Sequence, residues 1–218
     1  MNAILIPSLN RPQRLRATVD LIHKNTSEPH RILFCVSDQE SKNILHDLGE
    51  WFLDDSADED RRYVTRMNKL VRHIEDAETI FFGSDDVIHH PGWLTEALKV
   101  MDQGNAVVVV NDMHNSNGTQ ALMRADYLPK AVYDAPGDAF HSGYIHNFAD
   151  NEQHFTAFMY ATYARAMDSI VEHLHPIFGG HNAIPWDATY TNVQAGWAHD
   201  EALFHERAAM IDKALKVA

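Results

Sequence analysis

The sequence predicts an α/β fold in which a mainly parallel sheet is flanked by helices, within a chain of 218 residues. Short runs of consecutive apolar residues recur through the first half, and such runs are typical of strands buried on both faces of a parallel sheet. Segments with helical apolar spacing separate these runs. The alternation of strand and helix indicates βαβ units with right-handed crossovers.

Four strands are expected in the first half, at residues 3–6, 31–36, 79–82 and 106–110. The apolar residues that share one face of the intervening helices are Leu15, Val19 and Ile22; Ile44, Leu45 and Leu48; Met67, Leu70, Val71 and Ile74; and Leu94, Ala97, Leu98 and Met101. The last of these helices has Pro91 near its start and Gly104 just beyond its end, as is typical of helix boundaries.

The second half is less regular after Asn111. We expect a strand over residues 119–124, a helix over 151–166, a short strand over 169–175, a loop over 178–197 and a terminal helix over 199–216. We interpret the whole chain as a single domain. Residues 1–112 would form a nucleotide-binding type of half, and residues 113–218 would complete the ligand site.

Charge and cysteine content limit the classes of function. The chain has 18 Lys and Arg against 31 Asp and Glu, a net charge of −13, which disfavours non-specific binding to nucleic acid because such binding depends on basic side chains. The single cysteine, Cys35, excludes an internal disulfide and indicates a reducing compartment, so we expect a cytoplasmic protein. The first apolar run ends at Pro7, too early for a signal peptide or membrane segment, and we expect a soluble protein.

Polar residues follow three of the predicted strands, and ligands bind beyond the carboxyl ends of the strands in parallel sheets. The residues after the third strand are Gly83, Ser84, Asp85 and Asp86. Two adjacent carboxylates at the end of a buried strand favour a divalent cation, which prefers oxygen ligands. Capping of the next helix is the alternative, but that helix begins too far away. Asp38, after the second strand, is explained equally well as a helix cap.

These segments together resemble the family 2 glycosyltransferases of the GT-A fold, which use nucleotide-sugar donors. Residues 4–12, Ile-Leu-Ile-Pro-Ser-Leu-Asn-Arg-Pro, resemble the family's first strand and nucleotide loop, and Asp38 falls where an acidic residue contacts the base. Residues 62–69 resemble the start of a helix that faces the sugar nucleotide. Residues 81–87, followed by Pro91-Gly92-Trp93-Leu94, resemble the metal-binding D-x-D segment and its following helix.

The resemblance implies a donor site and a metal site. The donor-site residues that it implies are Pro7, Ser8, Asn10, Arg11, Asp38, Arg62, Arg66, Asn68, Ser84 and Asp85. The first position of the D-x-D segment is Ser84, so the ligand of Mn²⁺ or Mg²⁺ is Asp86 by strict register, or Asp85 if the pattern shifts by one. The pair His173 and His175 lies where many GT-A enzymes carry a further ligand, which implies His175.

The resemblance also implies an acceptor side. Residues 141–144, His-Ser-Gly-Tyr, resemble an acceptor loop, and the segment 148–152 that follows places Asp150 at the position of the catalytic base. The acid that usually precedes this base is Ala149 here, so Glu152 is a second candidate. Alternatively, Asp150 caps a helix and Glu152 lies in its first turn. Four further residues would either form a loop over the donor or pack within the fold, namely Trp186, Asp187, Tyr190 and Trp197.

We therefore interpret the chain as a metal-dependent, inverting glycosyltransferase whose donor is a nucleotide-diphosphate sugar. A UDP-sugar is the favoured donor. The acceptor stays open between a protein, a glycan and a modified nucleobase, as does the oligomeric state. One alternative is a non-catalytic protein that binds sugar nucleotides or carbohydrate, with Ser84 marking a lost metal site. A sugar-phosphate nucleotidyltransferase is less favoured because residues 7–12 lack glycine. A structural protein without a ligand is the remaining alternative.

Overall fold

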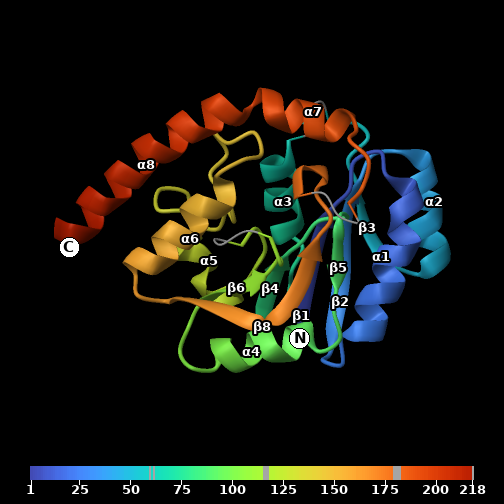
Figure 1. The fold of residues 1–218 in the computed structure, drawn as a ribbon, viewed down its shortest axis with the longest axis horizontal. Helices are drawn as coiled ribbons and strands as arrows, with labels where there is room; N and C mark the ends of the chain where they lie inside the picture. The colour runs from blue at the N-terminus through green and yellow to red at the C-terminus, as the bar shows by residue number, and fades with distance from the viewer. Residues whose placement is uncertain (59, 61, 115–117, 179–182, 218) are drawn as a thin grey trace.

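The computed structural model describes residues 1–58, 60, 62–114, 118–178 and 183–217, and within them it has an eight-stranded sheet flanked by helices (Figure 1). The strands are β1 (Asn2–Pro7), β2 (His30–Val36), β3 (Trp51–Asp54), β4 (Thr79–Phe82), β5 (Val87–His89), β6 (Val107–Asn111), β7 (Ala121–Arg124) and β8 (Tyr163–His173). The helices are α1 (Pro12–Asn25), α2 (Gln39–Leu48), α3 (Tyr63–Val71), α4 (Trp93–Met101), α5 (Leu128–Ala131), α6 (Ala149–Met159), α7 (Ala188–Ala195) and α8 (Trp197–Val217).

The direction of the strands determines which loops meet. The order across the sheet is β3-β2-β1-β4-β7-β6-β8-β5. Strands β1 to β4 are parallel to one another, and β6 is parallel to β8, whereas β7 runs antiparallel to β4 and β6, and β5 antiparallel to β8. The carboxyl ends of β1, β4, β6 and β8 therefore lie at the same edge as the first residues of β5 and β7. This edge is where ligands bind in sheets of this kind.

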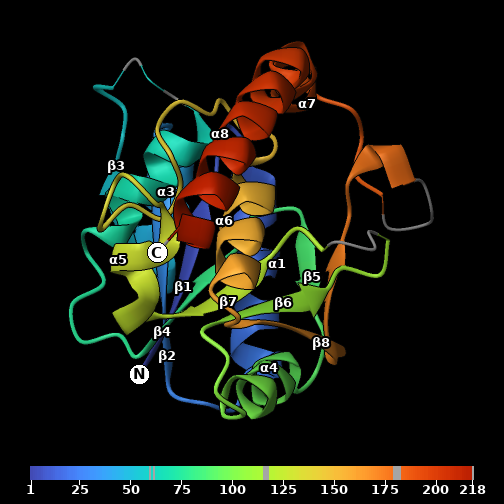
Figure 2. The same ribbon diagram turned by 90° about the vertical axis from the view of Figure 1, so that its left-hand side faces the viewer.

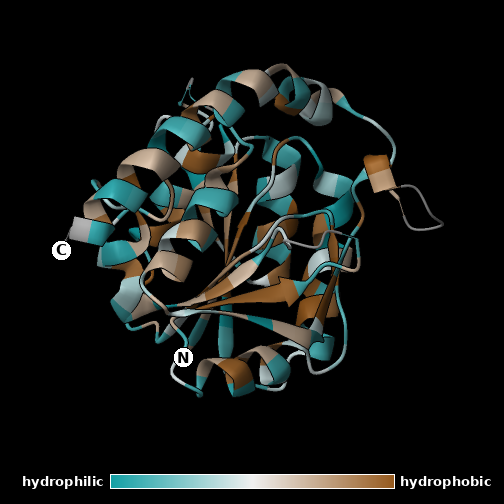
Figure 3. Ribbon diagram, turned by 60° about the vertical axis from the view of Figure 1, so that its left-hand side comes forward, coloured by the Kyte–Doolittle hydropathy of each residue, from teal (hydrophilic) through white to brown (hydrophobic). Residues whose placement is uncertain are grey.

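The core forms on both faces of the sheet, as the apolar runs predict. Ala3 and Leu5 of β1 pack in one buried cluster, with α3 and α6, and Ile4 and Ile6 pack in the other, with α1 and α4. Successive side chains of a strand point to opposite faces, so a strand buried on both sides must be apolar at every position. In Figure 3 several central strands are coloured as hydrophobic, and the helices around them mix hydrophobic and hydrophilic residues.

Helix α8 joins the second half to the rest. It follows α7 and runs along the outside of the molecule to the C-terminus, beside α6 (Figures 1 and 2). Arg207 of α8 pairs with Glu152 of α6 and with Asp134, at 2.6 and 2.8 Å. No helix among the described residues is both long and apolar enough to cross a bilayer. The expected cytoplasmic location and the division of the domain at residue 112 stay predictions.

Five strands of the fold confirm the sequence prediction, namely β1, β2, β4, β6 and β7. The predicted helix over 151–166 is wrong at its end, because α6 stops at Met159 and the chain turns at Ala161, whose φ is +54°. The predicted short strand over 169–175 is the end of the longer strand β8. Strand β8 is partly exposed along its length, so it has no continuous apolar run, and its pairing with β6 and β5 overrides the helix-forming residues at its start.

Three further elements lie where no regular structure is expected. Strands β3 and β5 are short and lie toward the two ends of the sheet, and β3 has half-exposed and exposed side chains. Helix α7 lies inside the predicted loop over 178–197, and its apolar residues do not follow a helical stripe. Its first turn is instead fixed by Asp187, which accepts hydrogen bonds from the N–H groups of Thr189 and Tyr190.

Candidate active site

A cavity of about 400 Å³ opens at the edge of the sheet where the strand ends meet. The loop after β1, the segment between β4 and β5, the end of β8 and the starts of α3, α6, α7 and α8 all contribute to its walls. Of the residues predicted for the site, those that line the cavity are Pro7, Arg11, Arg66, Ser84, Asp85, Asp86, Asp150 and His175. Ser8 lies directly behind the wall and contacts Asp85.

The two adjacent carboxylates have different surroundings. Asp85 is held by Ser8, whose hydroxyl donates to it at 2.6 Å, and by the guanidinium of Arg11 at 2.8 Å. Burial raises the pKa of Asp85, although Arg11 opposes this. Asp86 accepts a hydrogen bond from the hydroxyl of Tyr190 at 2.7 Å through Oδ2. Its other oxygen, Oδ1, is buried and makes no regular hydrogen bond within the described residues.

Two histidines follow Asp86 around the cavity wall. The Nε2 atom of His173 lies 3.6 Å from Oδ2 of Asp86, and its Nδ1 lies 3.2 Å from the hydroxyl of Thr119. Burial acts against the charged form of both partners, but their attraction prevails, so the pKa of His173 is raised and that of Asp86 is held well below its usual range. Burial and the neighbouring His173 lower the pKa of His175, which favours the neutral imidazole that binds metals.

The residues around Asp86 fit a divalent cation. Among the described residues there is no group of three or more His, Cys, Asp or Glu arranged to hold a metal by themselves. Mg²⁺ at phosphate-transfer sites is usually held by one or two carboxylates together with the phosphates of the substrate, so a complete protein cage is not required. Asp86 lines the cavity, and its Oδ1 has no hydrogen-bond partner of regular geometry among the described residues, so this carboxylate is a suitable ligand.

Arg66 supplies a buried positive charge on the wall of the cavity. Its Nη1 donates to the carbonyl of Ser8 at 3.0 Å, and its Nε lies 2.9 Å from a carboxylate oxygen of Asp55. Its Nη2 atom is buried without a hydrogen-bond partner in the described part of the chain. An unpaired guanidinium N–H is costly to bury and binds phosphate oxygens well, so this atom is suited to an anionic ligand.

Asp150 and Glu152, two residues apart on α6, have different roles in the fold. Asp150 lines the cavity, and burial raises its pKa to about 6. Glu152 is buried behind the wall, where it pairs with Arg207 at 2.6 Å and accepts the hydroxyl of Tyr144 at 2.7 Å. The carboxylate of Glu152 is therefore occupied by structural contacts, whereas Asp150 faces the cavity.

The remaining predicted residues do not line the cavity. Asn10 is exposed, and Asp38 caps α2 by accepting from the backbone N–H and the hydroxyl of Ser41. Arg62 pairs with Asp60 and donates to the carbonyl of Ser142. Asn68 is buried and hydrogen-bonds the backbone of Ala139 and Phe140. Their expected contacts with the donor stay predictions, and the side chains of Arg62 and Asn68 hydrogen-bond the backbone of residues 139–144.

Several cavity residues were missed by the sequence analysis. Tyr63, at the start of α3, and His146 both line the cavity, and their rings are 5.0 Å apart. Burial lowers the pKa of His146 to about 4, so this ring is neutral near pH 7. Neither residue lies in a strand-end motif, and only the packing of residues 145–147 beside α3 brings His146 to the cavity. No local pattern in the sequence marks it.

Helix α7 covers the acidic centre of the cavity. Its cap residue Asp187 pairs with Nε of Arg11 at 2.8 Å, and the ring of Tyr190 lies 4.6 Å from the guanidinium carbon of Arg11. Arg11 thus joins Asp85, on the sheet, to Asp187, on α7. Tyr190 and Asp187 were expected in a loop over the donor, and the structure places them in a helix at this position.

The sheet topology and the strand-end cavity define a mixed α/β protein with a cavity at the carboxyl ends of its strands, and solved structures have a similar fold. A mannosyltransferase from Pyrobaculum calidifontis in complex with GDP-Man and Mn²⁺ is similar, with a TM-score of 0.68 at 14% identity over 99% of this chain and 64% of that one. Glucosyl-3-phosphoglycerate synthase from Mycobacterium tuberculosis, with Mn²⁺, UDP and phosphoglyceric acid, has a TM-score of 0.65 at 9% identity over 95% and 78%.

S. aureus TarS is also similar, with a TM-score of 0.60 at 10% identity over 78% of this chain and 59% of the TarS fragment. No curated protein sequence matches. A sequence profile of glycosyl transferase family 2 matches residues 3–169. The chain therefore belongs to glycosyl transferase family 2, and the predicted resemblance and GT-A type of fold are confirmed. It spans 64% of the length of the mannosyltransferase.

Proposed function

We propose that this protein moves a sugar from a nucleotide-diphosphate sugar to the hydroxyl group of an acceptor. The observation that carries the proposal is the meeting of Asp86, Arg66 and Asp150 in one cavity. They supply a carboxylate for a cation, a guanidinium for phosphate oxygens and a carboxylate with a pKa near neutrality, which are the groups that such a transfer needs. Membership of glycosyl transferase family 2 supports the same reaction.

The donor would lie along the loop after β1 and the segment before β5. The free Nη2 atom of Arg66 is suited to the diphosphate, and Asp85, fixed by Ser8 and Arg11, is suited to hydroxyl groups of the ribose or sugar. A UDP-sugar is the donor that we favour, and the UDP complex of glucosyl-3-phosphoglycerate synthase supports it. The GDP-Man complex of the mannosyltransferase makes GDP-mannose the second choice.

A divalent cation, Mn²⁺ or Mg²⁺, would be held by Asp86 together with His175. The buried free Oδ1 of Asp86 and the lowered pKa of His175 support this assignment. When bound, such a cation neutralises charge on the leaving diphosphate. Both mannosyltransferase and synthase structures contain Mn²⁺, which supports the same choice.

Asp150 would act as the catalytic base. Its pKa of about 6 leaves it largely ionised at pH 7, yet basic enough to accept the proton of an acceptor hydroxyl as that oxygen attacks the sugar. Attack from the face opposite the leaving diphosphate inverts the anomeric centre. We do not assign this step to Glu152, because its carboxylate is occupied by Arg207 and Tyr144.

The test is release of free nucleotide from UDP-glucose or GDP-mannose with and without Mn²⁺. We expect release that depends on the cation, and a loss of about 10²-fold or more in Asp86→Asn, because one electrostatic contact to developing charge contributes that much. Asp47→Asn is the matched control, since Asp47 lies on the exposed face of α2. Nucleotide binding without any release, with or without added glycosides, would instead support a non-catalytic sugar-nucleotide-binding protein.

A further inference from the structure

Lysine and arginine are scarce in residues 131–206, the part of the chain that contributes His146, Asp150 and Trp197 to the cavity. Between Lys130 and Arg207 the sequence has one Lys or Arg, Arg165, against ten Asp and Glu. Arg165 lies on β8 and is not among the described residues that line the cavity. Among the described residues, Arg11 and Arg66 are the Lys and Arg side chains that line the cavity, and Arg62, which contacts the carbonyls of Ser142 and Tyr144, is paired with Asp60.

The two arginines that do line the cavity belong to its donor side. Arg11 is held between Asp85 and Asp187, and Arg66 lies against Ser8 and Asp55. A donor diphosphate would occupy the one free guanidinium atom, Nη2 of Arg66. A second phosphate, carried by the acceptor, would then be desolvated without a partner, which is unfavourable.

The charged and titratable groups on the acceptor side add to this exclusion. Asp150, the proposed base, is a carboxylate on the cavity wall, so the acceptor hydroxyl would lie beside it. His146 is neutral near pH 7, because burial lowers its pKa to about 4. A negatively charged acceptor would therefore be repelled by Asp150.

An aromatic surface lies on the same side. Trp197, the first residue of α8, lines the cavity although 50% of its surface is exposed. Its ring is held edge-on against Phe148 at 4.9 Å, and Phe148 stacks on Phe204 at 5.7 Å. A large ring that is fixed in place but not covered gains free energy when a ligand buries it. The C–H face of a pyranose ring is flat and apolar enough to do so.

We propose that the acceptor is an uncharged carbohydrate whose ring stacks on Trp197, and that phosphorylated acceptors are excluded. This assignment rests on the proposed function and narrows it. A nucleic-acid acceptor, including a modified nucleobase within a strand, is disfavoured because its phosphates would meet the same lack of cations. Trp197 is a binding residue in this proposal, and Asp150 takes the proton of a hydroxyl on the stacked sugar.

The experiment measures binding of matched pairs of small acceptors. Methyl glycosides of mannose, glucose and galactose are each compared with the corresponding 6-phosphate, by saturation-transfer NMR and Trp fluorescence, with UDP and Mn²⁺ present. We expect at least one neutral glycoside to bind, and its 6-phosphate to bind about tenfold more weakly or not at all. The Trp197→Ala substitution should weaken binding of the neutral glycoside by about tenfold. Trp51→Ala is the control, because Trp51 is similarly exposed, at 43%, but lies on β3 outside the cavity.

Two results with the glycosides overturn the proposal, as does a third with the control variant. One is that the 6-phosphates bind as well as the neutral glycosides or better, and the other is that no neutral glycoside binds. Loss of binding in Trp51→Ala equal to that in Trp197→Ala also contradicts it. Failure of the proposed function gives a different result. In that case no nucleotide is released from the donor, with or without glycosides, even if the glycosides bind to the protein.

Discussion

Neighbouring carboxylates in this protein differ in what surrounds them. Asp150 and Glu152 lie two positions apart on one helix, yet one faces the cavity and the other is paired with an arginine. Sequence alone left both as candidates for the base, since both are acids in the first turn of α6. The distinction comes from Arg207, which is 55 positions away from Glu152 along the chain.

This difference predicts opposite effects of two conservative substitutions. Asp150→Asn should lower the rate of sugar transfer by about 10²-fold or more and leave the melting temperature nearly unchanged. Glu152→Gln should destabilise the fold by about 3–5 kcal/mol, because it leaves Arg207 as a buried charge without its main partner. Transfer assays and chemical denaturation measure the two effects.

Asp134→Asn is the matched control for the second effect. Asp134 also pairs with Arg207 but is 43% exposed, so its loss should cost less than about 1 kcal/mol. If Glu152→Gln proves as stable as the wild type and instead stops transfer, the roles given to the two carboxylates are reversed.

At the scale of elements, α8 positions part of the cavity wall. The buried carboxylate of Asp200, in its first turn, accepts hydrogen bonds from the backbone N–H groups of Ile145, His146 and Asn147, at 2.8 to 2.9 Å. His146 and Asn147 line the cavity. A helix on the outside of the molecule therefore fixes the conformation of a loop that lines the cavity.

Asp200→Ala should accordingly affect stability and acceptor binding together. It leaves three N–H groups without a charged acceptor, and each such bond contributes about 1.5 kcal/mol or more, so a loss of roughly 4.5 kcal/mol or more is expected. The acceptor KM should rise more than the donor KM, because the displaced residues belong to the proposed acceptor side. Denaturation and two-substrate kinetics measure these changes.

Asp212→Ala is the control on the same helix. Asp212 forms an exposed pair with Lys216, one turn away, and its loss should change stability by less than about 0.5 kcal/mol. Equal increases of both KM values in Asp200→Ala would contradict a specific role for the helix in the acceptor wall.

At the scale of the whole molecule, the sequence predicts those parts of the fold that are encoded by short-range patterns of residues. Buried parallel strands need continuous apolar runs, so β1, β2, β4 and β6 and the cavity at their ends could be predicted. The first part of strand β8 could not, because this strand is half-exposed and is defined by its neighbours. Among site residues, Arg62 and Asn68 have polar side chains of the expected type, but they contact backbone groups more than 70 positions away. Such long-range contacts leave no trace in the sequence nearby.

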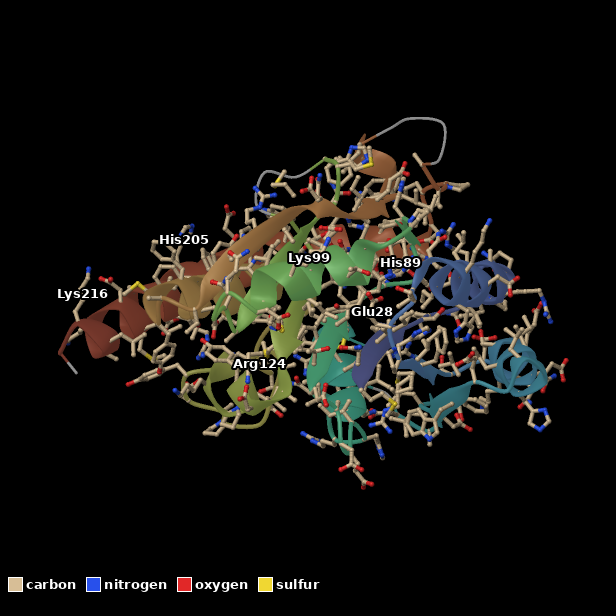
Figure 4. The ribbon with its side chains drawn as sticks, turned by 90° about the horizontal axis from the view of Figure 1, so that it is seen from below. Glu28, His89, Lys99, Arg124, His205 and Lys216 are labelled. Carbon is tan, nitrogen blue, oxygen red and sulfur yellow. The ribbon has the colours of Figure 1, made fainter. Side chains whose placement is uncertain are left out.

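Two buried histidines predict how the stability of the whole fold depends on pH. His89 is buried against Phe81 and Trp93 with no hydrogen-bond partner for either ring nitrogen among the described residues, and it lies beside α4, the helix that carries Lys99 (Figure 4). Burial lowers the pKa of His89 to about 3 and that of His154 to about 4. Between pH 6.5 and these values the unfolded chain binds protons that the folded protein does not, so the free energy of unfolding falls as the pH falls.

Each of these histidines should remove about 1.4 kcal/mol of stability per pH unit below 6.5, or about 2 kcal/mol by pH 5. His89→Leu should therefore flatten the dependence of the free energy of unfolding on pH, measured by urea denaturation at pH 7.5, 6 and 5. His46→Gln, at an exposed position of α2, should leave the slope unchanged. A slope in His89→Leu equal to that of the wild type would show that His89 is protonated in the folded protein at these pH values. The ring would then need a partner that the packing around Phe81 and Trp93 does not offer.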